Sequence, residues 1–93
     1  MIARVFISGF VQGVGFRRFV KHHSLKLGLK GWVKNLSDNR VEALLVGSKE
    51  QIKKIIAICR KGSFLSEVSI VEVMWGEDLS AGVENFEDFE ILT

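Results

Sequence analysis

Short apolar segments rich in Val, Ile and Phe recur along the chain, and their length and spacing are typical of β-strands. Five segments fit this description: Ala3–Phe10, Lys30–Leu36, Arg40–Val46, Val68–Trp75 and, as a short tail strand, Phe86–Leu92. Only Ser37, Asp38 and Asn39 separate the second segment from the third. Because Asn tolerates the left-handed backbone that a tight turn needs, we expect these two strands to form a β-hairpin.

In two places the apolar period changes from that of a strand to that of a helix. The first helix is predicted from Phe16, with a stop at Gly28. Its core-facing positions are Phe16, Phe19, Val20, His23 and Leu27. The second helix is predicted after Ser48, which forms a capping box with Gln51, and it ends at Gly62. Its apolar stripe consists of Ile52, Ile55, Ile56 and Cys59.

The order of these elements is β-α-β-β-α-β with a short C-terminal strand. Two helices and an antiparallel sheet in that order predict an α+β fold, a ferredoxin-like two-layer sandwich. We found no repeat, linker or low-complexity tract, and the chain contains no proline. Residues 1–93 are therefore interpreted as one domain. Because this fold hosts many functions, the function must be argued from the site.

Composition favours a soluble protein of the cytoplasm. The longest apolar run, Ile55–Cys59, is far too short to span a bilayer, and Met1–Val11 does not resemble a signal peptide. The chain has a single cysteine, which excludes an internal disulfide and is compatible with a reducing compartment. We expect no membrane partner and a monomer.

Charge is distributed unevenly along the chain, although the net charge is only +2. Residues 1–40 carry eight Lys or Arg and one acid, whereas residues 41–93 carry five basic and ten acidic residues. Arg17 and Arg18 fall in the first turn of the first predicted helix. A positive charge there is unfavourable by roughly 0.3–1 kcal/mol unless an anion compensates it. This pattern indicates an anionic ligand.

The segment between the first strand and the first helix, "FVQGVGFRRF", offers a place for that anion. It is neither a nucleotide P-loop, since no Gly-Lys-Ser/Thr follows, nor a dinucleotide fingerprint, since Arg18 stands where a third glycine is needed. Gly13 and Gly15 instead expose a run of backbone N–H groups at a helix start, which can form a phosphate-sized nest. The guanidinium of Arg17 matches phosphate oxygens. The alternative is a tight turn that simply requires glycine.

Two stretches together resemble the acylphosphatase family. They are "SGFVQGVGFR" at residues 8–17 and "LGLKGWVKNLSDNRVEALLVG" at residues 27–47, and the resemblance extends to the helix at 48–61 and to Phe89–Ile91. The resemblance implies hydrolysis of the carboxyl–phosphate bond of acyl phosphates without a metal or cofactor. It also implies that inorganic phosphate is both product and inhibitor. Departures from the family pattern, such as Asn39 in place of a turn glycine, do not affect the matching motif residues.

The resemblance also implies roles for individual residues. Arg17 binds the phosphate together with the loop amides, and Asn35 positions the attacking water. The loop residues are Gln12, Gly13, Val14, Gly15 and Phe16. These roles suit the chemistry, because the leaving carboxylate has a pKa of about 4 and needs no general acid. Positioning and neutralisation of the phosphoryl oxygens suffice.

Two other classes of function are compatible with this order of elements. An RNA-recognition module shares the order of elements, but it carries aromatic residues on its third strand, and "RVEALLVG" has none. A regulatory homologue without catalysis is less favoured because Arg17 and Asn35 are both present. His22 and His23 are adjacent and cannot comfortably share a metal, so no metal site and no nucleic-acid partner are expected.

Overall fold

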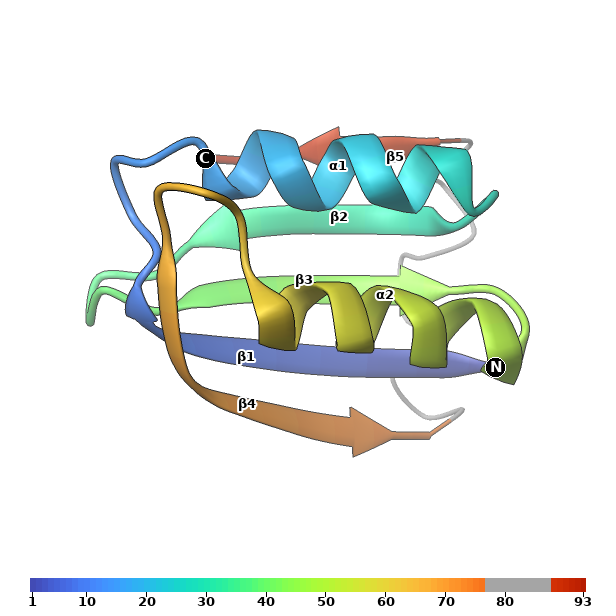
Figure 1. Cartoon of the computed structure of the whole chain (residues 1–93). Helices are drawn as coiled ribbons and strands as arrows, with labels where there is room; N and C mark the ends of the chain where they lie inside the picture. Colours follow the sequence, from blue (N-terminus) through green and yellow to red (C-terminus); the bar gives the residue numbers. More distant parts are fainter. Residues whose placement is uncertain (77–87) are drawn as a thin grey trace.

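The computed structural model describes residues 1–76 and 88–93. Its elements follow the predicted β-α-β-β-α-β order with one further strand (Figure 1). The elements are β1 (Ile2–Phe10), α1 (Phe16–Lys26), β2 (Lys30–Asn35), β3 (Val41–Val46), α2 (Lys49–Lys61), β4 (Glu67–Trp75) and β5 (Phe89–Ile91). Neither helix is long and apolar enough to cross a membrane, as far as the described residues go.

The predicted boundaries of β1 to β4 are confirmed to within one residue. The last strand is shorter than predicted and begins at Phe89, while Phe86 and Glu87 lie outside the described residues. The capping box of α2 is confirmed. The Ser48 Oγ accepts a hydrogen bond from the Gln51 N–H at 3.1 Å, and the Gln51 Oε1 accepts one from the Ser48 N–H at 2.8 Å. Local side-chain chemistry therefore fixes the start of this helix.

The sheet has the strand order β4-β1-β3-β2-β5. Its first four strands pair antiparallel, but β5 runs parallel to β2, so the prediction of a purely antiparallel sheet is wrong for this pair. The reason lies in where the chain leaves β4. The end of β4 lies beside the start of β1, and Lys30 at the start of β2 lies at that same end of the sheet. A strand that starts there and follows the edge of β2 must run in the same direction as β2.

Both helices pack on one face of the sheet and form a two-layer sandwich (Figure 1). The main core lies between the layers, where alternate strand residues meet the apolar stripes of the helices. Its central members include Val5, Ile7, Val33, Phe16 and Ile55, none more than 1% exposed. The opposite face of the sheet carries a smaller cluster of Ile2, Trp32 and Leu44. The alternation of side chains along β1 and β2 therefore determines which face of these strands packs against the helices.

Candidate active site

The loop between β1 and α1 is shaped by two glycines in the left-handed region. Gly13 has a φ of 76° and Gly15 a φ of 77°. A Cβ at either position would meet no atom within 4 Å, so glycine is required here by backbone conformation and not by crowding. Gly15 is also the N-cap of α1, and no side chain in the described part of the chain caps this end. The first N–H groups of α1 are consequently available to a ligand.

Three side chains hold this loop in place. Val11 and Phe16 flank it and are each 1% exposed, so the core anchors both of its ends. The Gln12 Nε2 donates hydrogen bonds to the carbonyl oxygens of Leu36 and Arg40, both at 2.9 Å. The amide of Gln12 thus ties the loop to the β2–β3 hairpin. The sequence predicted Gln12 only as a backbone ligand, and this second role was missed because its partners are distant along the chain.

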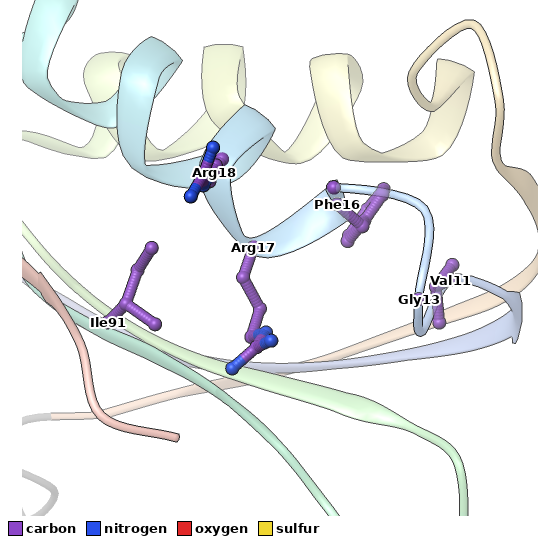
Figure 2. A pocket seen from close by; sticks show the side chains of 7 residues that line it. Val11, Gly13, Phe16, Arg17, Arg18 and Ile91 are labelled. Atoms are coloured by element: carbon purple, nitrogen blue, oxygen red, sulfur yellow. The ribbon is translucent and has the colours of Figure 1, made fainter.

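Arg17 extends from the first turn of α1 into a cavity at the start of the helix. Figure 2 shows its side chain reaching from the helix toward the sheet, beside the glycine loop. The cavity has a volume of about 290 Å³. It is lined by Val11, Gly13, Gly15, Phe16, Arg17, Arg18 and Ile91. A guanidinium and the glycine loop therefore face one space large enough for a phosphate group.

The positive charge at this site is not neutralised within the described residues. The three ion pairs found there are Arg4–Glu42, Lys34–Glu42 and Arg40–Asp38, and all involve the opposite face of the sheet or the hairpin. The first turn of α1 contains no acidic residue. Arg17 and Arg18 therefore add to the partial positive charge of the helix start, and the site has the electrostatic character of an anion-binding site.

Asn35 is the last residue of β2 and lies on the helix-covered face of the sheet. It is the cross-strand neighbour of Val41, which in turn neighbours Ile7, and both of these are buried in the core. The Asn35 Oδ1 is buried and has no hydrogen-bond partner among residues 1–76 and 88–93. A buried polar atom left without a partner costs about 1–3 kcal/mol, which is the kind of cost retained at functional positions.

The structure brings together most, but not all, of the site residues expected from sequence. Gly13, Gly15, Phe16 and Arg17 line one cavity, whereas Gln12, Val14 and Asn35 are not among its lining residues. Gln12 lies next to Gly13 and ties the loop to the hairpin, and Val14 packs against the core. Asn35 ends β2, which β3 separates from β1 in the sheet.

Three of the lining residues, Val11, Arg18 and Ile91, were not among the site residues predicted from the sequence. Arg18 was noted only as a charge at the helix start. The sequence marked Ile91 only as part of the family match at Phe89–Ile91, and its place in the cavity depends on the pairing of β5 with the edge of β2.

The remaining titratable groups do not form a second site in the described part of the chain. No group of three or more His, Cys, Asp or Glu side chains gathers there as metal ligands. Cys59 is buried, and burial raises the pKa of its thiol to about 12. Burial also lowers the pKa of His23, as do the neighbouring His22 and Lys26. These groups are compatible with structural roles.

Comparison with known proteins gives a consistent result. A family model described as acylphosphatase matches residues 3–91. An acylphosphatase of Chloroflexus aurantiacus is 47% identical over 75 residues, covering 81% of this chain and 82% of the relative. One from Archaeoglobus fulgidus is 42% identical over 92 residues, covering 98% of each. The crystal structure of acylphosphatase from Bacillus subtilis superimposes with a TM-score of 0.89 at 35% identity over 100% of both chains. The chain belongs to the acylphosphatase family.

Proposed function

We propose that this protein hydrolyses acyl phosphates to a carboxylate and inorganic phosphate, with the phosphoryl group bound by Arg17 and the loop amides of residues 12–17. The observation that carries the proposal is the guanidinium of Arg17 in the cavity of the glycine loop, at a helix start with no acid in its first turn. Among the described residues this guanidinium forms no ion pair. A phosphoryl dianion would neutralise this charge and accept hydrogen bonds from the open N–H groups. Membership of the acylphosphatase family supports the same substrate class.

The reaction needs little from the protein beyond positioning and charge neutralisation. The oxygen of a water molecule forms a bond to phosphorus, and the bond between phosphorus and the acyl oxygen breaks. The electron pair of that bond leaves with the carboxylate, while both protons of the water remain on the phosphate product. Since the leaving carboxylate has a pKa of about 4, no general acid is required. Arg17 and the amides stabilise the charge that spreads over the phosphoryl oxygens.

In this proposal Asn35 positions the attacking water. The position of Asn35 at the end of β2 and the absence of a hydrogen-bond partner for its buried Oδ1 support a role in binding a small polar molecule. An amide can accept a hydrogen bond from water and so orient the oxygen toward phosphorus. When the water is held next to the phosphoryl group, the two reactants no longer need to meet by diffusion, and this raises the rate of the reaction considerably.

The proposal is tested by incubating the purified protein with benzoyl phosphate and measuring the release of phosphate. We expect hydrolysis that persists in EDTA, and competitive inhibition by inorganic phosphate, because the site recognises the phosphoryl group common to both. Complete loss of activity in EDTA with recovery on adding a divalent ion would contradict the metal-independent mechanism. Purely non-competitive inhibition by phosphate would contradict the assignment of the site. We also propose that the protein is a monomer and acts in the cytoplasm. Sedimentation of the pure protein tests the oligomeric state.

A further inference from the structure

Two consecutive arginines line the same cavity, but only one is needed to bind a phosphoryl group. Consecutive residues on a helix diverge by about 100° around its axis, so Arg17 and Arg18 cannot both point at the same spot. Arg17 is half-buried, whereas Arg18 is exposed. In Figure 2 the guanidinium of Arg17 lies toward the sheet while Arg18 stays close to the helix, and Ile91 faces the cavity from the other side. Arg18 therefore belongs to the rim of the cavity.

Binding of the phosphoryl group leaves Arg18 without a counter-charge in the part of the chain that the structure describes. A phosphoryl dianion at the loop is opposed by Arg17 and by the partial charge of the helix start. Arg18 forms no ion pair among the described residues, and the first turn of α1 contains no acid that could approach it. A second anion at the rim would be attracted by a guanidinium that is free to form hydrogen bonds.

The acyl group of a bound substrate has to occupy the part of the cavity that the phosphoryl group leaves free. With the phosphoryl end at the loop amides, the rest of the cavity lining includes Arg18 and Ile91. Ile91 is 36% exposed, so it offers an apolar surface to a short carbon skeleton. A group at the far end of such a skeleton then lies near Arg18.

We infer that Arg18 binds a second anionic group on the acyl part of the substrate, so that acyl phosphates whose acyl group carries a carboxylate are preferred over neutral ones. This inference rests on the proposed function and names the substrate class of that site. Arg18 acts here as a specificity-determining residue. The interaction is present before the reaction starts, so it affects KM more than kcat.

The inference is tested with rigid substrates that cannot cyclise onto their own phosphate. The probes are 3- and 4-carboxybenzoyl phosphate, and each is compared with its carbamoyl analogue, which has the same shape without the charge. For the wild type we expect kcat/KM to be about two- to fivefold higher for at least one carboxylated isomer, the range of an exposed ion pair. Arg18→Gln should remove this preference, and Arg18→Lys should retain part of it.

Lys21→Gln provides a matched control, because it removes one positive charge from the same helix at a position that does not line the cavity. It should leave the ratio between carboxylated and carbamoyl substrates as in the wild type. The inference is overturned if neither carboxylated isomer is preferred, or if Lys21→Gln reduces the preference as much as Arg18→Gln. Failure of the proposed function looks different, because then none of the four substrates is hydrolysed by the wild type.

Discussion

Arg17 occupies a position where its charge is unfavourable without a bound anion. Arg17→Gln should therefore weaken phosphate binding and slow turnover, because the guanidinium contacts the phosphoryl group before and during the reaction. Arg17→Lys should not restore activity, since an ammonium cannot form the bidentate contact. In phosphate-free buffer the free energy of unfolding of the Gln variant should be equal to that of the wild type or higher by up to roughly 0.3–1 kcal/mol. Calorimetry with phosphate, steady-state kinetics and urea unfolding measure these three effects. Activity close to wild type in the Lys variant would contradict the role.

Substitution of Asn35 should affect kcat without affecting the affinity for phosphate. If this residue holds the water, Asn35→Ala should lower kcat by about a hundred- to a thousandfold, or roughly 2.7–4 kcal/mol, while the phosphate Kd stays near the wild-type value. Removing the buried and unpaired Oδ1 should not reduce stability. Lys30→Ala, at the exposed start of the same strand, serves as a control and should retain both kcat and phosphate affinity. An Asn35→Ala variant that loses phosphate binding but turns over normally at saturation would reverse the assigned roles.

At the scale of elements, the loop between β1 and α1 depends on its tie to the β2–β3 hairpin. Gln12→Ala removes both hydrogen bonds from its side chain and leaves the carbonyl oxygens of Leu36 and Arg40 without that donor. We expect a loss of about 1–3 kcal/mol in the free energy of unfolding and a weaker phosphate affinity, since the loop is less well held. Urea unfolding and phosphate calorimetry measure the two effects. A wild-type phosphate Kd would show that the loop is held without Gln12.

The conformation of the loop itself can be tested at Gly15. An alanine there must adopt a φ near 77° in a left-handed conformation, which costs roughly 1–2 kcal/mol. Gly15→Ala should therefore lower stability or move the loop and reduce activity. Asn39 provides the matched control, because it too has a positive φ, of 72°, and Asn39→Gly relieves this strain at a position that does not line the cavity. We expect Asn39→Gly to retain activity. Full activity and stability of Gly15→Ala would remove the structural basis of the nest.

The elements differ in how far the sequence could predict them. The capping box between Ser48 and Gln51 and the alternating strands are local signals, and the corresponding boundaries are confirmed. The parallel direction of β5 could not be predicted, because it depends on the edge of the sheet that the chain reaches after β4. The same holds for Ile91 and for the side-chain bonds of Gln12, which link residues far apart in sequence. A family motif indicated Arg17 and Asn35. That Arg18 lines the cavity is seen only in the folded structure.

At the scale of the whole molecule, positive charge is concentrated on the two helices. The helices α1 and α2 contain nine of the thirteen Lys and Arg residues but one of the eleven acids. None of the nine is in an ion pair with any residue that the structure describes. The cavity opens at the start of α1, within this positive layer. Fields of this kind raise the local concentration of anionic substrates and the rate at which they associate with the site.

This concentration of positive charge predicts a specific response to salt. Raising the ionic strength from about 0.01 M to about 0.5 M shortens the screening length from about 30 Å to a few ångströms, so distant cations no longer attract the substrate. We expect kcat/KM for benzoyl phosphate to fall several-fold while kcat changes little, because the chemical step depends on contacts inside the cavity. The double variant Lys53→Gln/Lys54→Gln removes two exposed charges of α2 that do not line the cavity. It should reduce the dependence of kcat/KM on salt and leave kcat at the wild-type value. A kcat/KM that is constant across this range of salt would show that the charge of the helical layer does not guide the substrate.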